Sequence, residues 1–600
     1  MIIHIFSSIL FFFITLFTSI GYGLIFKKII LKNNSFYSYG ELGIYGLFFL
    51  SLISIIMHFF VSLNAYLNLL IVIFGISVIF FKVDLIKKFK KRYIVIFLLL
   101  FPSLIFFEYH ADYFWYHLPY INVAHDYKII FGLANLNDNL GYSHIWYDIL
   151  AILNLPYFET YYLSVVAIVF LFFFLIFLSE YYSIFSNKFT RTFIIFCISF
   201  IAMIYSNSKD YGSEIQVNLI YLMISIYIFQ YFNENKITEK YYIIQKIFLI
   251  FLFSILIRTN SIIFFPLILF FLLFNFKILY NFILNFKFFL SFLFLFSFIY
   301  LTKNFIINGC LSYPIYFTCF ELLDWGVGVE QAKLRFYHLS AQSKGYLLWL
   351  INEDYIKNIF DFFQYREGNF FISPERYIKE FNWLFFWWQY EYDIDRLLNI
   401  IYFFILSTLI IVLYNFKNLD VSKIFKQLKS NFLKIILFSV PIVSWLLLLP
   451  QSRYGGYGII FTLSCILSLV IINSISKLKI MPIYIIVFIS IFYFEYKNID
   501  RIIRNFNSIE NNTYYNFYNY PKLKYTQYRI NKTFEIIINE RVNNIDEVKG
   551  APLYCNDIKG LCASSYRVNC IEDIKIRRGY IFIIPNKKNC ALVIDKYLWY

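Results

Sequence analysis

Charged side chains are scarce in this 600-residue sequence, where Asp, Glu, Lys and Arg together make up 15% of the residues. A soluble domain is typically about one-quarter charged. With 60% hydrophobic residues and a mean hydropathy of +0.64, the composition excludes an ordinary soluble protein and predicts a chain that lies mostly in lipid. Phe and Tyr are so frequent, at 77 and 54 residues, that we interpret most single aromatic residues as packing or lipid-facing side chains.

Several signatures of well-known enzymes are also absent. The sequence contains no HExxH, P-loop, GxSxxG or Rossmann fingerprint, so the sites that these motifs mark are not expected. The first residues lack the basic start and the small-residue cleavage site of a signal peptide. We therefore expect residues 2–25 to be retained as a first membrane helix.

The net charge of +16 can indicate binding to nucleic acid. The Lys and Arg residues cluster, however, in short loops between apolar runs, which is the positive-inside pattern of a polytopic membrane protein, and we expect no nucleic-acid partner. A spanning helix needs about 20 mostly apolar residues. We predict fourteen membrane helices, near residues 2–25, 42–62, 65–81, 93–107, 158–178, 192–206, 214–232, 246–258, 261–276, 288–302, 397–415, 434–450, 456–474 and 480–495.

The basic loops predict an orientation. The loop KVDLIKKFKKRY (82–93) carries six basic residues and one acidic residue, so we expect it to face the cytoplasm. Counting helices outward from it places the other short basic loops on the same side and both chain termini on the extracytoplasmic side. The expected location is the bacterial cytoplasmic (inner) membrane. Because the cytoplasmic loops are short and basic, ATP-driven chemistry within this chain is not expected.

The fold expected from this pattern is an all-α transmembrane bundle of about 14 helices, with extracytoplasmic loops and a small α+β extracytoplasmic domain at the C-terminal end. The chain divides into N-terminal membrane helices (1–107), a first large extracytoplasmic loop (108–157), further membrane helices (158–302), a large extracytoplasmic or interfacial loop (303–396), C-terminal membrane helices (397–495) and an extracytoplasmic domain (496–600).

Four of the eight cysteines lie in the predicted C-terminal domain, at Cys555, Cys562, Cys570 and Cys590. On an oxidising side of the membrane they are candidates for one or two disulfides. A zinc site is the alternative, but no closely spaced CxxC pair supports it. We expect Cys197 and Cys465 to pack within helices.

The stretch EYHADYFWYHLPY (108–120) gathers ionisable groups directly beyond an apolar run. A carboxylate at the outer end of a membrane helix is costly unless it is hydrated, paired or functional. Taken alone, Asp112 is better explained as a solvated loop acid. The loop continues with further His, Asn, Asp and aromatic residues, however, and this composition favours a surface that handles a sugar or a lipid head group.

Two arginines occur at the ends of apolar runs on the same predicted side. Arg453 lies in the turn PQSRYGGYG (450–458), and Arg258 lies in IRTNS between two apolar runs. Arginine suits bidentate recognition of phosphate, although either side chain alone could simply reach toward lipid phosphates. Glu214 begins a helix on that side, where its charge also complements the helix dipole. His117 and His125 are candidate ligands or bases, but each is better explained as a hydrogen-bonding loop histidine.

Several of these motifs, taken in order, resemble a known group of proteins. The pattern D-x-x-x-Y-H-L-P (112–119), the stretch GLANL (132–136) and the turn Leu140-Gly141-Tyr142 are joined by NFIINGCLSYPIYF (304–317), Asp324-Trp325 and the P-x-x-R-Y turn (450–454). The sequence resembles a poorly characterised family of bacterial multi-pass membrane proteins that is similar to the GT-C glycosyltransferases. The resemblance covers most of residues 40–460. GT-C enzymes are membrane enzymes that use polyprenyl-phosphate-linked sugars.

The resemblance implies a catalytic acid residue in the first large external loop, here Asp112, and a lipid-phosphate contact at Arg453. Two departures are clear, because four helices precede the acidic loop instead of one, and Glu214 stands where Asp is more usual. The expected substrate-binding residues are Tyr116, His117, Asn135, Glu214, Arg258 and Arg453, with Trp115 beside them. No cofactor is required, although Asp112 and Glu214 leave room for a bridging divalent metal.

The sequence therefore favours a glycosyltransferase whose partners are a polyprenyl-phosphate sugar donor in the membrane and a glycan or lipid acceptor. Two alternatives stay open. A polymerase or ligase of surface polysaccharide would depend on the 303–396 loop, not on Asp112. A transporter of lipid-linked or anionic substrates would show internal repeats and charged or broken helices at mid-membrane, and we find no convincing repeat.

Overall fold

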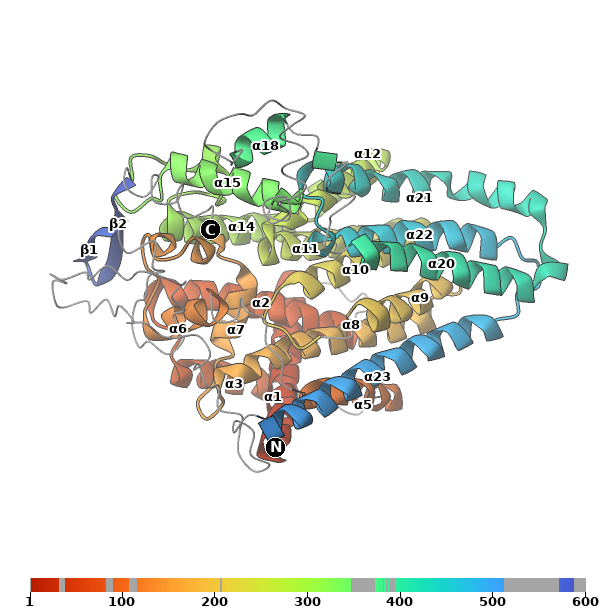
Figure 1. Ribbon diagram of the computed structural model, residues 1–600, viewed down its shortest axis with the longest axis horizontal. Coiled ribbons are helices and arrows are strands. Elements are labelled where there is room, and N and C mark those ends of the chain that lie inside the picture. The colour runs from red at the N-terminus through yellow and green to blue at the C-terminus, as the bar shows by residue number, and fades with distance from the viewer. Residues whose placement is uncertain are drawn as a thin grey trace.

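The computed structural model describes residues 2–31, 38–81, 90–106, 116–205, 208–346, 373–380, 383–384, 387, 394–511 and 571–587. Most of these residues are helical (Figure 1). The larger helices are α1 (Ile2–Phe26), α2 (Tyr39–Phe60), α3 (Ala65–Phe80), α5 (Lys91–Ile105), α6 (Leu118–Asp126), α7 (Ile145–Ile152), α8 (Val165–Ile184), α9 (Lys188–Ile204), α10 (Glu214–Asn233), α11 (Ile237–Ile257), α12 (Phe265–Phe274), α13 (Phe276–Asn285), α14 (Lys287–Asn308), α15 (Val329–Ser343), α18 (Pro374–Glu380), α20 (Ile394–Tyr414), α21 (Val421–Leu448), α22 (Gly456–Ile472) and α23 (Met481–Asn511).

Long apolar helices make this a multi-pass membrane protein. Among the described residues, nine helices are long and apolar enough to cross a membrane. Each of the fourteen predicted segments contains a helix, but several are short: α3 has 16 residues, α5 has 15, and α9 and α22 have 17 each. The prediction of a helical, multi-pass bundle is therefore confirmed, whereas the number of fourteen spans stays a prediction.

One apolar segment is bent. A helical stretch over Thr259–Phe274 and the following α13 meet at an angle of 96°, so the two together form one broken span or a re-entrant loop. The bend lies at the end of the span predicted over 261–276, and α13 occupies most of the stretch between that span and the one predicted over 288–302.

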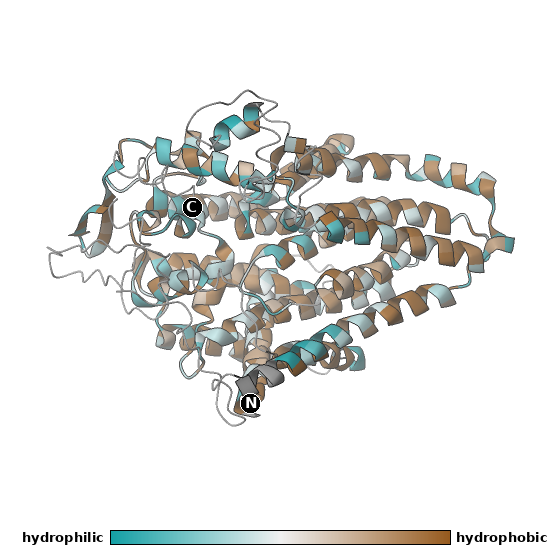
Figure 2. Ribbon diagram, in the orientation of Figure 1, coloured by the Kyte–Doolittle hydropathy of each residue, from teal (hydrophilic) through white to brown (hydrophobic). Residues whose placement is uncertain are grey.

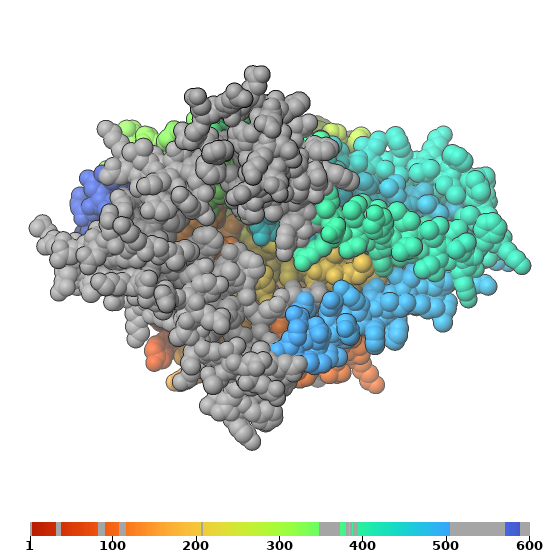
Figure 3. Space-filling model, viewed as in Figure 1, coloured from red at the N-terminus to blue at the C-terminus, as the bar shows by residue number. Residues whose placement is uncertain are grey.

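The outer surface of the bundle is apolar. Hydrophobic residues predominate along α20, α21 and α22 in Figure 2. In Figure 3, α20 and α23 lie on either side of α9, and their outward side chains include Leu413 and Phe488, each 70% exposed. Exposed side chains of this kind are suited to contact with lipid tails.

The two ends of the bundle differ in composition. The turn between α20 and α21 pairs with the turn between α22 and α23, since the Ser476 N–H donates to the Asn418 carbonyl at 3.0 Å. Both turns carry lysines, and we call this the basic end. Helices α6 and α7 and the strands lie at the opposite side of the molecule (Figure 1), which we call the loop-bearing end.

A two-stranded antiparallel sheet lies in the described part of the predicted C-terminal domain. It consists of β1 (Ile571–Arg577) and β2 (Tyr580–Pro585). Phe131 forms backbone hydrogen bonds of 2.9 Å with Ile581 and Ile583, and its ring stacks on Phe582 at 4.3 Å. Helix α23 continues to Asn511, beyond the domain boundary expected at 496. The disulfide candidates Cys555, Cys562, Cys570 and Cys590 lie outside the described residues.

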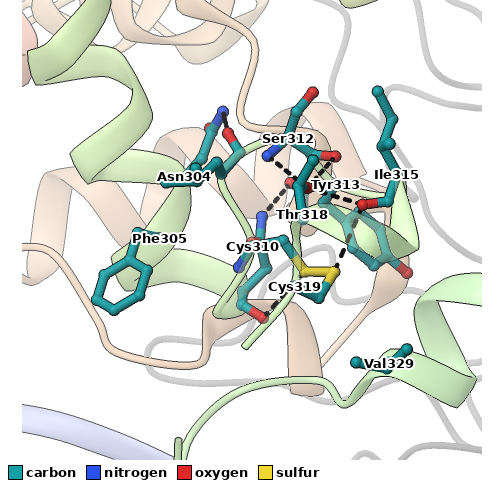
Figure 4. The surroundings of a disulfide bond; sticks show 12 residues. Asn304, Phe305, Cys310, Ser312, Tyr313, Ile315, Thr318, Cys319 and Val329 are labelled. Atoms are coloured by element: carbon teal, nitrogen blue, oxygen red, sulfur yellow. Dashed lines mark hydrogen bonds between the residues drawn. A yellow bond between two sulfur atoms is a disulfide. The ribbon is translucent and has the colours of Figure 1, made fainter. Parts of the chain in front are cut away.

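A disulfide that the sequence analysis did not anticipate joins Cys310 to Cys319, nine residues apart (Figure 4). It closes the loop that follows α14 at the loop-bearing end. Thr318 strengthens this loop, because its Oγ1 donates to the Ile315 carbonyl at 2.7 Å and accepts from the Ser312 N–H at 3.2 Å. Cys197 and Cys465 are free and buried within helices, as expected.

A buried ion pair lies among the helices at the start of α2. Lys246 Nζ on α11 donates to Glu41 Oε1 at 2.8 Å, and the hydroxyls of Tyr181 and Tyr227 donate to the same oxygen at 2.8 and 2.6 Å. Glu41 Oε2 accepts the Ser38 N–H at 2.7 Å in a capping box. Because every contact satisfies a charge that would otherwise be stranded in an apolar environment, we interpret this cluster as structural.

We predict that Lys246→Met lowers the free energy of unfolding by about 3–5 kcal/mol, because the Glu41 charge is left buried without its partner. The double variant Glu41→Gln/Lys246→Met should recover much of that loss. Thermal unfolding in detergent measures both effects. Lys423→Met, which removes an exposed pair with Asp420, is the control and should change stability by less than about 1 kcal/mol. Equal losses in the single and double variants would contradict the interpretation.

The orientation predicted from the basic loops can be tested with single cysteines. Glu159 is exposed near the loop-bearing end and Lys423 is exposed at the basic end. We expect a membrane-impermeant maleimide to label Glu159→Cys in intact cells, and Lys423→Cys only after the membrane is opened. The unsubstituted protein gives the background from native cysteines. The reverse labelling pattern would invert the orientation.

Candidate functional site

A polar pocket lies on the side of the bundle away from the basic end. There, the ends of α10, α11 and α21 meet the segments that lead into α6 and α7. Its volume is about 70 Å³, enough for a few water molecules or one phosphate-sized group. Ten residues line it: Tyr116, His117, His144, Tyr147, Asp210, Gly212, Ser213, Glu214, Arg258 and Arg453. They come from five separate parts of the chain, and each part is the end of a helix or a turn next to one.

Two arginines share one carboxylate in this pocket. Glu214 Oε1 lies 3.0 Å from Arg258 Nη1 and 3.6 Å from Arg453 Nε. Both guanidinium groups also lie against the ring of Tyr454, at 4.4 and 5.2 Å from its centre. Because both guanidinium groups lie next to the same carboxylate, an anion that binds here would meet two arginines at once.

The amino-terminal end of α10 forms one wall of the pocket. Ser213 is the N-cap residue and makes no side-chain capping hydrogen bond. The positive end of a helix dipole and its free N–H groups attract negative charge. Asp210 lies just before this helix and accepts the N–H of Tyr211 at 2.7 Å. The pocket therefore contains two guanidinium groups, a helix N-terminus and two carboxylates.

Buried polar contacts hold Arg453 in place. Asn218, on the second turn of α10, donates to the Arg453 carbonyl at 3.4 Å and accepts the Gly458 N–H at 3.0 Å. Trp445 Nε1 donates to the Gln451 carbonyl at 3.0 Å. Gly455 has φ of +105°, and a Cβ there would lie 2.8 Å from Ile263. The turn thus favours a glycine two residues after the arginine that it presents.

A lysine fixes the segment that carries Asp210. Lys209 is buried, and its Nζ donates to the carbonyls of Leu104 and Phe106 at 3.2 and 3.0 Å. Two further hydrogen bonds hold Tyr211, the residue after Asp210. Trp146 donates to the Tyr211 carbonyl at 3.0 Å, and the Tyr211 hydroxyl donates to the Tyr161 carbonyl at 2.7 Å. The acidic wall of the pocket is therefore attached to the end of α5.

Histidines and tyrosines form the opposite wall. The rings of His117 and Tyr147 lie 5.0 Å apart, and His144 lies 5.6 Å from Tyr147. Burial, reinforced by the nearby positive charge of Arg258, holds the pKa of His144 well below its usual value. His144 is therefore neutral at physiological pH and acts as a hydrogen-bonding group, not as a third cation.

A buried ion pair supports α7 behind this wall. Lys303 on α14 and Asp148 are both fully buried and their charged atoms are in contact. Tyr120 donates to the other carboxylate oxygen at 3.1 Å. The pair connects α6, α7 and α14, so it fixes the helices that begin at the pocket.

The structure brings together five of the residues proposed from the sequence: Tyr116, His117, Glu214, Arg258 and Arg453. Asn135 is elsewhere. It is buried, and its Nδ2 donates to the carbonyls of Trp325 and Ile583 at 2.8 and 3.2 Å, so it holds the β hairpin. His125 contacts Asp126 at 2.7 Å, outside the pocket. Asp112 and Trp115 lie outside the described residues.

Five pocket residues were not proposed from the sequence: His144, Tyr147, Asp210, Gly212 and Ser213. Asp210 precedes Glu214 by four residues in the same polar stretch, and that spacing was the available signal. Among the residues that the structure describes, no three His, Cys, Asp or Glu side chains gather to hold a metal ion. A metal between Asp112 and Glu214 stays a prediction.

The geometry predicts that this pocket binds a phosphate-type anion. We expect Arg258→Gln and Arg453→Gln each to weaken pyrophosphate binding by about tenfold to a hundredfold, through loss of charged hydrogen bonds. Glu214→Gln should tighten it several-fold, because a competing negative charge is removed. Isothermal titration of the purified protein measures the three effects. Arg504→Gln, which removes an exposed ion pair on α23, is the control. Unchanged affinity in both pocket arginine variants would contradict the assignment.

Comparisons with known proteins give a family without an assigned activity. No curated protein and no solved structure matches the chain. The family model of a domain of unknown function, DUF8201, matches residues 1–365. This match spans more than half of the sequence and includes every pocket residue except Arg453, and the chain therefore belongs to the DUF8201 family.

Proposed function

We propose that this protein is a membrane glycosyltransferase that moves a sugar from a polyprenyl-phosphate-linked donor to a cell-surface acceptor at the outer face of the cytoplasmic membrane. The observation that carries the proposal is the sharing of Glu214 between Arg258 and Arg453 beside the N-terminus of α10. This cluster is suited to an anion, and it lies at the ends of long apolar helices, where a lipid-linked phosphate can reach it.

The two arginines would bind the phosphate of the donor. In the reaction, an oxygen of the acceptor hydroxyl forms a bond to the anomeric carbon while the bond from that carbon to the phosphate oxygen breaks. The phosphate leaves with the bonding electrons, and the guanidinium groups stabilise the charge that develops on it. A single displacement of this kind inverts the configuration at the anomeric carbon.

The proton of the acceptor hydroxyl needs a base. Asp112 is the proposed base, following the resemblance to GT-C enzymes, and it lies four residues ahead of the pocket residue Tyr116 in the sequence. A carboxylate within hydrogen-bond reach of the attacking hydroxyl can accept its proton. Tyr116, His117 and the neutral His144 would orient the sugar by hydrogen bonds and ring contacts.

The position of the pocket favours transfer over transport. Substrate sites of secondary transporters lie near the middle of the membrane, between repeats and at broken helices. Here Glu214 begins α10 and Arg258 follows the last residue of α11. A surface-polysaccharide polymerase or ligase would use a similar outer site, and the choice of acceptor separates it from the proposed enzyme.

Transfer of radiolabelled sugar tests the proposal. Purified protein in lipid nanodiscs is given a panel of polyprenyl-phosphate monosaccharides and an acceptor extract. We expect transfer by the wild type, a fall in kcat/KM of about 10²–10³-fold for Arg453→Gln through loss of charge stabilisation, and a comparable or larger fall for Asp112→Asn. Arg504→Gln should retain full activity.

The outcomes discriminate between the alternatives. Transfer that survives Asp112→Asn but is lost in Arg453→Gln would retain the phosphate site and reject Asp112 as the base. Transfer that survives both substitutions would reject the pocket as the active site. Release of free sugar without an acceptor, abolished in Arg453→Gln, would support donor cleavage at the pocket.

A further inference from the structure

A second cavity lies between α5, α8, α9 and α23. It differs from the polar pocket in its volume and in the residues that line it. Its volume is about 400 Å³, within the usual range of about 300–1,000 Å³ for ligand pockets. Leucine and isoleucine side chains dominate its lining, among them Leu100, Leu178, Ile198 and Ile491. It shares no lining residue with the polar pocket. An apolar cavity of this size suits a hydrocarbon chain.

An arginine lies among these apolar side chains. Arg92, on the first turn of α5, donates through Nη1 to the Ser179 carbonyl at 2.9 Å and to Ser183 Oγ at 3.4 Å. Its Nε and Nη2 are buried and have no hydrogen-bond partner among the described residues. Leaving charged donors buried and unpaired is costly. An anionic oxygen beside the guanidinium group would lower this cost.

The charge around Arg92 favours an anion from the membrane. Lys90 and Lys91 directly precede it, and Lys188 begins α9. Arg191 lies over the ring of Tyr182, a residue that also lines the cavity. Basic residues at a membrane surface attract anionic lipids. One carboxylate, Glu180, lies near Lys90 and Arg92. It is already held by the Tyr39 N–H and the Tyr93 hydroxyl. The cavity therefore combines an apolar body with a border in which basic residues outnumber acidic ones.

The other charged residue of the lining fixes the orientation of the occupant. Glu495 follows Tyr484 by eleven residues on α23, which corresponds to about 16 Å along a helix. Tyr484 lies beside Tyr182, since their hydroxyls are 3.3 Å apart. Arg92 attracts a phosphate whereas Glu495 does not, so the head group belongs at the Arg92 border and the acyl chain extends along α23 toward Glu495.

The side of α23 next to the cavity is itself a lipid-facing surface. Phe488 is 70% exposed and Phe492 is 66% exposed, and both lie within a few residues of the lining residues Val487 and Ile491. A lipid of the surrounding bilayer can therefore reach the cavity from the side. A water-soluble ligand would have to cross an apolar surface to do so.

We propose that this cavity is a binding site for an anionic phospholipid of the surrounding bilayer, of the phosphatidylglycerol type, whose phosphate pairs with Arg92 and whose acyl chain fills the space between α5, α8, α9 and α23. The site is independent of the proposed glycosyl transfer, because it involves neither the polar pocket nor its arginines.

Native mass spectrometry tests the proposal on the full-length protein. Protein released from nanodiscs is compared in phosphatidylglycerol and in phosphatidylcholine, and undecaprenyl phosphate is added as a competitor. We expect a retained phosphatidylglycerol adduct, at least fivefold less of it in Arg92→Gln, and no change in Lys423→Gln, which removes an exposed charge remote from the cavity. Ile198→Trp should also reduce the adduct, because the indole fills the cavity.

Folding of each variant is checked by thermal unfolding in detergent, where each should unfold within a few degrees of the wild type. Equal adducts in Arg92→Gln and the wild type would overturn the proposal. Equal retention of phosphatidylcholine would overturn the role assigned to charge. Displacement of phosphatidylglycerol by an equimolar amount of undecaprenyl phosphate would assign the cavity to an isoprenoid lipid instead.

Discussion

The cost of placing a charged group in hydrocarbon controls the architecture of this protein. An isolated Lys, Arg or Asp at the centre of a membrane helix costs about 3 kcal/mol on biological insertion scales. Most charged residues accordingly lie in turns and at helix ends. The few charged side chains inside the bundle have ionic or hydrogen-bonding partners. The structural clusters differ from the candidate sites in how their charged side chains are paired.

Two clusters are fully neutralised. Glu41 receives three hydrogen bonds on one oxygen and a backbone N–H on the other, and Asp148 is paired with Lys303 and Tyr120. Two other places are arranged differently. Arg258 and Arg453 divide one carboxylate oxygen, and Arg92 keeps two buried donors without a partner in the described part of the chain. An arginine next to the end of an apolar helix is the feature common to both proposed binding sites.

The sequence predicted much of the pocket because a membrane topology has few degrees of freedom. Glu214, Arg258 and Arg453 each lie at the end of an apolar run, and alternation of helices brings those ends to one side. The sequence could not show which loop residues line the pocket. His144 and Asp210 line the pocket, whereas Asn135 holds the β hairpin, and this difference depends on packing between segments far apart in the chain. The pairing of Cys310 with Cys319 likewise cannot be predicted from hydropathy.

The central claim is that Arg258 and Arg453 together bind the phosphate of a lipid-linked sugar. The most direct measurement is an electron cryomicroscopy structure of the protein in nanodiscs with a non-hydrolysable polyprenyl-phosphonate sugar. We expect phosphonate density within hydrogen-bond distance of both guanidinium groups, with Glu214 displaced from at least one of them. Density at another site, with both arginines still on Glu214, would contradict it.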